Sequence, residues 1–202
     1  MSRTDDARTQ LVFTMARLLR DQGYTATPLA QVLSESGVSN GSLYHHFPGG
    51  MEELAVAALE ASGQAVADAL SQALDGAPGT AEGLVAFLDF AAGPVTGAPC
   101  PGCPIAPTAL ESSILSPRLR DAAARCFEQW ETLIAARLRA DGWPEDAVPE
   151  TASAALSLIE GALLLARVSG QLGHLASAKR ATTALLASAP ETGKRRNARA
   201  AR

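Results

Sequence analysis

The side chains that could do chemistry are concentrated in two short stretches of the chain. The first, "SNGSLYHH" at residues 39–46, carries hydroxyl, amide, phenol and imidazole groups, which can bind phosphates and the edges of bases. The second, "CPGC" at residues 100–103, spaces two cysteines as thiol-disulfide enzymes and zinc sites do. The residues alone therefore point to nucleic-acid recognition or to thiol chemistry.

The cysteine pair, Cys100 and Cys103, lacks the surroundings that thiol chemistry needs. A thioredoxin-like enzyme needs a strand before the pair and a βαβ unit, and the sequence predicts neither. A zinc site needs two further ligands, and Cys126 with one of the three histidines is a poor supply. We therefore expect no enzyme, no metal and no cofactor, with loop or core cysteines as the main interpretation. A regulatory disulfide, or a thiol-disulfide enzyme using this pair, is the alternative.

The composition favours helices and a cytoplasmic location. Of the 202 residues 47% are apolar but only 4% are aromatic, so the core must be mostly alanine and leucine, which suit helices. We find no strand-like alternation and no internal repeat. No uninterrupted apolar run reaches the roughly 18 to 20 residues of a membrane span, and the polar start "MSRTDDARTQ" has no signal-peptide segment. We expect an all-α cytoplasmic protein without membrane contact.

Three predicted helices at the start of the chain position the first polar stretch. Apolar spacing predicts an amphipathic helix that stops at Gly23. Thr27 is expected to cap a second helix, with a proline as its first residue and an end at Gly37. Ser39 caps a third helix, and "PGG" at 48–50 ends it. Two short helices joined by a glycine turn form a helix-turn-helix, which sets its second helix into the major groove of DNA.

The third predicted helix has an apolar inner side and a polar outer side. Leu43 and Phe47, four residues apart, would anchor it to the other two helices. Gly41 is unfavourable in a helix by about 1 kcal/mol relative to alanine, yet it lets the backbone approach a groove wall closely. The side chains that would face base edges and phosphates are Asn40, Ser42, His45 and His46. The competing interpretation is that any three-helix core can contain such a turn.

Longer helices are predicted beyond this module. One from residue 51 to about 73 would join the module to the rest, and "DGAPGT" breaks it. Further helices are predicted over residues 80–92, 104–115, 117–140, 145–171 and 173–188. The expected division is into residues 1–50, 51–188 and 189–202, the last being a basic, disordered tail.

The segment "GYTATPLAQVLSESGVSNGSLYHHFPGG", residues 23–50, resembles the DNA-binding module of TetR-family transcriptional repressors, a likeness that spans residues 8–60. "GCPIAPTALE", residues 102–111, resembles the start of a ligand-domain helix in the LmrA/YxaF-like branch. The resemblance implies a homodimer whose residues 1–50 bind double-stranded operator DNA and repress a promoter. It also implies that residues 51–188 bind a small, mostly apolar effector, which releases the DNA.

Carried over by position, the resemblance gives roles to single residues. Thr27 and Tyr44 would hold phosphates, and Asn40 could read adenine through its amide. The DNA-binding set is then Thr27, Ser39, Asn40, Gly41, Ser42, Tyr44, His45 and His46. Asn40 and Met51 stand where the family commonly has lysine, so attraction to the phosphate backbone should be weaker than usual.

The large side chains of the second domain have two interpretations. They are either ordinary core or the walls of an effector pocket, since pockets are lined mainly by apolar and aromatic groups. The predicted ligand-binding set is Phe87, Phe90, Ile105, Phe127, Trp130, Ile134 and Leu158. Small residues and leucines over 145–171 and 173–188 could pack two chains together, or could form a hairpin within one chain.

The formal net charge of −4 is distributed unevenly. Four arginines balance four acidic residues in 1–50, eight cations face sixteen anions in 51–188, and five cations face one anion in 189–202. The acidic middle would repel a polyanion, so any contact with DNA belongs to the ends. The tail could replace the phosphate attraction missing at Asn40 and Met51, or it could be a solvated end without function.

Overall fold

The computed structural model describes residues 3–93 and 100–187, which contain α-helices and connecting loops but no strand. The helices are α1 (Arg3–Gln22), α2 (Leu29–Ser36), α3 (Asn40–His46), α4 (Gly50–Asp75), α5 (Thr80–Ala91), α6 (Ala106–Leu115), α7 (Pro117–Ala140), α8 (Val148–Ser169) and α9 (Gly173–Leu186). The expected all-α architecture is confirmed. The predicted basic tail lies outside the described residues.

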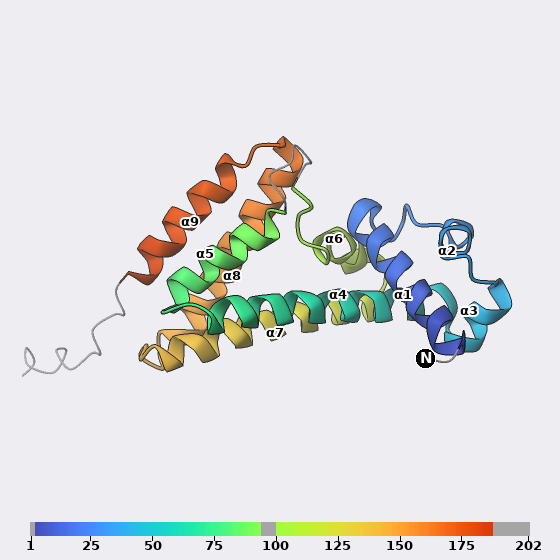
Figure 1. The fold of residues 1–202 in the computed structure, drawn as a ribbon, viewed down its shortest axis with the longest axis horizontal. Coiled ribbons are helices and arrows are strands. Elements are labelled where there is room, and N and C mark those ends of the chain that lie inside the picture. Colours follow the sequence, from blue (N-terminus) through green and yellow to red (C-terminus); the bar gives the residue numbers. More distant parts are fainter. Residues whose placement is uncertain (1–2, 94–99, 188–202) are drawn as a thin grey trace, which may run out of the picture.

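Two groups of helices share the long helix α4 (Figure 1). The helices α1, α2 and α3 gather at one end of the molecule, and α5, α8 and α9 at the other, while α4 and α7 run side by side along its length. With 26 residues, α4 is about 39 Å long. It packs against α1 in the first group, against α5 in the second, and along α7 between them. A shift of α4 would therefore be felt at both ends of the molecule.

Several helix boundaries differ from those predicted. The helix α1 already begins at Arg3, where aspartates near a helix start are favourable for the helix dipole. The cap predicted at Thr27 is wrong: Pro28 holds the N-cap position of α2 without a side-chain cap bond. Gly50, expected to end the third helix, is the first residue of α4, with a φ of +68° and its N–H on the Phe47 carbonyl at 2.8 Å.

Close packing of α4 on α7 explains a glycine and a tryptophan in the core. A Cβ on Gly63 would lie 2.3 Å from the Cys126 Sγ atom, so only glycine fits between the two helices. The Trp130 indole N–H donates to the Gly63 carbonyl at 3.0 Å, and the side chain is fully buried. Phe127 packs edge to face on Trp130, with ring centroids 5.2 Å apart. This seam is the most tightly fitted part of the second domain.

The carboxylate of Asp141 ties the start of α5 to the end of α7. The Asp141 carboxylate accepts from both the backbone N–H and the hydroxyl of Thr80, each at 2.6 Å, and from Arg137 at 2.8 Å. Burial alone would raise the pKa of Asp141, but these hydrogen bonds outweigh it and lower the pKa. Arg137 also donates to the Ala77 carbonyl at 3.0 Å, which fixes the α4–α5 loop.

By length and composition alone, α8 could cross a membrane. Glu160 and Arg167 interrupt its apolar sequence, and in the bundle the helix packs against α7 and α9. Buried residues such as Ile159 and Leu163 form its inner side. The bundle therefore accounts for the apolar character of the inner side of this helix.

Candidate DNA-binding face and ligand cavity

A glycine turn and a serine cap fix the angle between α2 and α3. Gly37 ends α2 in the left-handed region, at φ +67°, and its N–H donates to the Leu33 carbonyl at 3.0 Å. Ser39 has extended backbone, and its hydroxyl accepts from the Ser42 N–H at 3.2 Å, as predicted for the cap of α3. The buried side chain of Val38 holds the turn between them against the core. The local sequence thus dictates a helix-turn-helix.

The outer side of α3 is polar and exposed, whereas its inner side is fully buried. Leu43 and Phe47 lie in the core, as predicted. Tyr44 is 48% exposed on the opposite side. The other outward residues are Asn40, Gly41 and His45, with Ser42 partly exposed.

Gly41 is not required by the folded protein itself. A Cβ at this position would meet nothing within 4 Å, and its φ is not positive. By contrast, Gly50 needs a positive φ, and a Cβ there would come within 3.3 Å of the Tyr44 ring. Since neither packing nor backbone conformation requires glycine at position 41, we interpret it as leaving space for a molecule that binds the outer side of α3.

Thr27 and His46, two of the predicted DNA-binding residues, turn inward. The Thr27 side chain is buried, and its hydroxyl donates to the Gly23 carbonyl at 2.6 Å, so it satisfies the end of α1 instead of facing a phosphate. The His46 Nε2 atom is also buried and has no hydrogen-bond partner among the described residues. Its ring packs edge to face on His45, at 5.0 Å between centroids. A helix only seven residues long cannot turn all its polar groups outward.

The described arginine side chains of this module lie on α1, and acidic or aromatic groups engage them. Arg17 forms an ion pair with Glu35, and Arg20 with Asp21 at 3.0 Å. Arg8 lies over the Phe47 ring, 5.5 Å from its centroid. The polar face of α3 therefore carries hydrogen-bonding groups but no arginine or lysine of its own.

A cavity of about 240 Å³ lies in the second domain, beside α5, α7 and α8. Of the predicted ligand-binding residues, Phe87, Phe90 and Trp130 line it. The other four predicted residues line none of the cavities described here. Ile105 and Ile134 are fully buried in the core, whereas Phe127 and Leu158 are partly buried. The amphipathic pattern could not separate these groups, because core residues and cavity-lining residues are both apolar and face the same interior.

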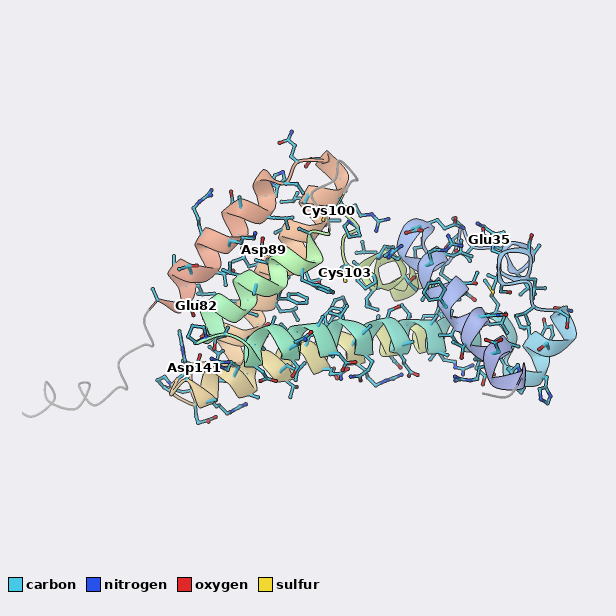
Figure 2. The ribbon with its side chains drawn as sticks, viewed as in Figure 1. Glu35, Glu82, Asp89, Cys100, Cys103 and Asp141 are labelled. Carbon is cyan, nitrogen blue, oxygen red and sulfur yellow. The ribbon has the colours of Figure 1, made fainter. Side chains whose placement is uncertain are left out.

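Sequence reasoning missed the polar lining of this cavity, Cys103, Glu160 and Arg20. Glu160 could have been noticed, because it is the only charged residue in the apolar run "SAALSLIEGALLLA" (153–166). Burial raises the pKa of the Glu160 carboxyl, and a hydrogen bond from the Cys103 thiol opposes that rise. Both Cys103 and Cys100 are buried in the segment that leads into α6 (Figure 2).

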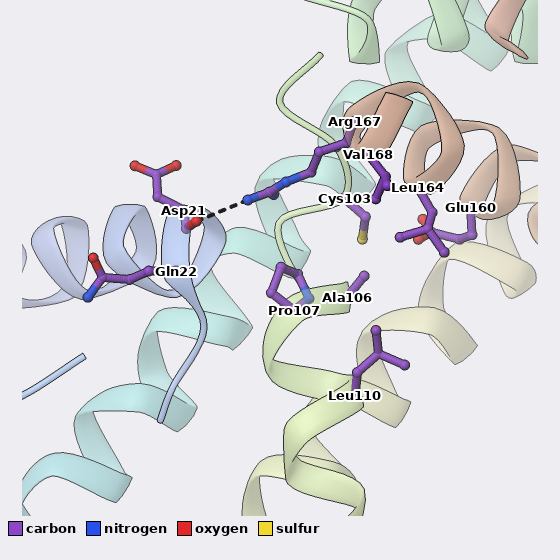
Figure 3. A pocket seen from close by; sticks show the side chains of 11 residues that line it. Asp21, Gln22, Cys103, Ala106, Pro107, Leu110, Glu160, Leu164, Arg167 and Val168 are labelled. Carbon is purple, nitrogen blue, oxygen red and sulfur yellow. Dashed lines mark hydrogen bonds between the residues drawn. The ribbon is translucent and has the colours of Figure 1, made fainter. Parts of the chain in front are cut away.

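An adjoining cavity of about 310 Å³ reaches the end of α1 (Figure 3). It shares Gly102, Cys103 and Glu160 with the first cavity. Arg167 of α8 spans its edge and donates to the Asp21 carbonyl at 3.1 Å and to the Pro101 carbonyl at 3.0 Å. This cavity thus lies between α8 and the last turn of α1.

A second polar contact holds the same end of α1. The Thr25 N–H donates to the Glu111 carboxylate of α6 at 2.8 Å. A Cβ on Gly23, which has a φ of +80°, would clash with that carboxylate at 2.3 Å. Through Arg167 and Glu111, helices α8 and α6 therefore both touch the helix on which α3 rests.

Comparison with known proteins decides the family. Residues 15–58 match the bacterial regulatory proteins of the tetR family, and residues 80–181 match the C-terminal domain of LmrA/YxaF-like transcriptional regulators. The chain is 33% identical over 166 residues to the uncharacterized HTH-type transcriptional regulator YxaF of Bacillus subtilis, covering 82% of this chain and 87% of that protein. The chain belongs to the TetR family.

Other TetR-family relatives agree with this assignment. The HTH-type transcriptional regulator LmrA of Bacillus subtilis is 32% identical over 176 residues, covering 85% of this chain and 94% of that protein. A TetR-family regulator from Cytophaga hutchinsonii has the same fold, with a TM-score of 0.79 and 22% identity over 95% of this chain and 98% of that one. The protein is thus a DNA-binding transcriptional regulator of this family.

Proposed function

We propose that this TetR-family protein is a homodimeric repressor that leaves its operator when a small, mostly apolar effector enters the second domain. The observation that carries the proposal is the outer side of α3, which is polar, exposed and contains a glycine that the fold does not need. A protein that acts at an operator in this way works in the cytoplasm.

On the DNA side, α3 supplies the groups that would read and hold the operator. The Asn40 amide can pair bidentately with an adenine edge, and the exposed Tyr44 hydroxyl can donate to a phosphate. Gly41 lets the α3 backbone come close to the groove wall. Because the module lacks lysine at positions 40 and 51, hydrogen bonds carry more of its operator affinity than ion pairs do.

Two-fold symmetry follows from the small size of α3. One helix of seven residues reads too few bases to select an operator, whereas a dimer presents two such helices to a palindrome. Exposed apolar side chains on α8 and α9 support a dimer through these helices. They are Leu164, Leu165, Val168, Leu172 and Leu185, the fourth of which lies just before α9.

On the effector side, the two adjoining cavities give the second domain a place for a ligand next to the joint with α1. A ligand that binds better when the contacts of Arg167 and Glu111 with α1 are changed would shift the population toward that state. The two recognition helices would then no longer match the spacing of the half-sites. Coupling between effector binding and operator release thus needs only a small shift at one end of α1.

A thiol-disulfide enzyme using Cys100 and Cys103 is not favoured. Thiol reactivity depends on the thiolate, and burial raises the pKa of Cys103 well above its ordinary value. The Cys103 sulfur instead accepts from the Ile105 N–H at 3.4 Å, close to the start of α6. We assign it a structural role.

Selection of DNA fragments by the purified protein tests the repressor proposal. We expect an enriched palindrome with two half-sites one helical turn or a multiple apart, and size measurements showing two protein chains per operator. Tyr44→Ala serves as the matched variant and should enrich the same motif less strongly. Fragments without a shared motif would contradict the proposal.

A further inference from the structure

We infer that the cavity beside α8 takes an apolar, ring-bearing molecule with a protonated amine, which the carboxylate of Glu160 binds. The inference rests on the proposed effector function and narrows the effector to a chemical class. It comes from the one acidic side chain that both adjoining cavities share, and from the aromatic rings around it.

Glu160 lacks the cationic partner that a carboxylate in such surroundings needs. Among the described residues only the Cys103 thiol forms a hydrogen bond with it, and no cation stabilises its charge. A thiol is a weak donor, and a carboxylate can accept several strong hydrogen bonds. A largely buried carboxylate without further partners is unfavourable, so the site is incomplete as it stands.

The two arginines close to the cavities are already engaged. Arg167 donates to the Pro101 and Asp21 carbonyls, and Arg20 forms an ion pair with Asp21 at 3.0 Å. Among the described residues, neither arginine forms an ion pair with Glu160. The remaining space in front of this carboxylate belongs to a ligand.

The rings of the cavity suit an organic cation. Phe87 and Phe90 lie 6.5 Å apart between centroids, and Trp130 lines the same cavity. The Trp130 N–H is already bonded to the Gly63 carbonyl, so the indole offers the ligand only its apolar ring. Aromatic faces attract ammonium groups, and they also bury the apolar part of such a molecule.

Other ligand charges fit this site less well. A carboxylate-bearing ligand would be repelled by the like charge of Glu160. A neutral alcohol could donate one hydrogen bond to Glu160 but would leave the charge unpaired. We therefore expect the site to select ligands by the positive charge of the ammonium group and not by the shape of the apolar part.

Three probes of matched shape test this assignment: 4-phenylbutylamine, 4-phenylbutan-1-ol and 4-phenylbutanoic acid. Calorimetry on the full-length protein should show the amine binding at least tenfold more tightly than the alcohol, and the acid most weakly. Glu160→Gln should remove the difference between amine and alcohol. Glu150→Gln, an exposed acid in the first turn of the same helix, should preserve it.

The native protein gives a result even if Glu160→Gln does not fold, because the three probes are compared on the unchanged chain. Equal binding of amine and alcohol, failure of all three probes to bind, or an unchanged amine preference in a folded Glu160→Gln variant would overturn the assignment. Operator release by the amine is measured separately, by fluorescence anisotropy of labelled DNA. Amine binding that depends on Glu160 without operator release would leave this site intact and refute the effector function proposed for it.

Discussion

The recognition helix and the ligand cavity place their polar groups in opposite ways. On α3, polar side chains such as Asn40 and Tyr44 point away from the protein, and the core beneath them depends only on Leu43 and Phe47. In the cavity, apolar rings form much of the wall and the carboxylate of Glu160 points into the protein. The outward groups of α3 have water as an alternative partner, whereas among the described residues Glu160 has the thiol of Cys103.

This difference predicts different costs of mutation in the two regions. Changing an exposed side chain of α3 removes an intermolecular contact and leaves the core intact. Changing a cavity wall removes packing that also supports the α4–α7 seam. The DNA-binding face can therefore be altered with little loss of stability, and the cavity cannot.

The largest expected effect is that of Trp130→Ala. Removing this buried ring and its bond to Gly63 should lower the free energy of unfolding by about 3–5 kcal/mol. Tyr44→Ala, the control on the exposed side of α3, should change it by about 0.5 kcal/mol or less. Urea unfolding of both variants measures this, and equal losses would remove the contrast between the two regions.

Next in size is the effect of Asn40→Ala on operator reading. Losing a bidentate contact should cost about 1–3 kcal/mol of binding free energy at one base pair of each half-site, with no change elsewhere. Tyr44→Ala should instead weaken binding to every sequence equally. Anisotropy titrations against operators with single base changes separate the two patterns. A uniform loss for Asn40→Ala would place this residue among the phosphate contacts.

The variant Arg167→Ala tests the contact between α8 and α1, which links the cavity to the DNA-binding module. Without the bond to the Asp21 carbonyl, the coupling between effector and operator should fall by about 0.5–2 kcal/mol. Operator affinity in the absence of effector should stay within about twofold of the native value. Arg180→Ala, on the exposed side of α9, is the matched control. Unchanged coupling in Arg167→Ala would show that this contact does not transmit effector binding to the DNA-binding module.

The smallest expected effect, Gly41→Ala, has opposite signs for stability and for binding. Alanine in this open helical position should raise the free energy of unfolding by up to about 1 kcal/mol. The added methyl should at the same time weaken operator binding. Gly161→Ala in α8, where a Cβ also meets nothing within 4 Å, should stabilise similarly without weakening DNA binding. If Gly41→Ala kept full operator affinity, α3 would not approach DNA closely at this position.

Sequence alone predicted the α2–α3 turn better than the lining of the cavity, for a physical reason. The α2–α3 turn is encoded locally, by Gly37 and by the cap of Ser39, so neighbouring residues suffice to place it. The inward turn of Thr27 was not predictable from its type, because a threonine hydroxyl can either cap the helix that follows or, as here, donate to a carbonyl of the loop before it, that of Gly23.

In the cavity, contacts between distant segments decide which residues are lining. Phe87 and Ile105 both look like core in the sequence and both are buried, yet only Phe87 lines the cavity. Glu160 is a lone acid in an apolar run that the sequence analysis passed over, and its contact with Cys103 joins segments 57 residues apart in the chain. Such pairings follow from the assembled fold.

The central claim is that the ligand cavity and the DNA-binding face are separate sites linked through α1 and α4, and one pair of titrations tests it directly. The affinity of 4-phenylbutylamine is measured by calorimetry on the free protein and on the protein–operator complex. Linkage requires the amine to bind the complex more weakly, by the same factor by which saturating amine weakens operator binding. Identical amine affinities for the free and the operator-bound protein would contradict the account.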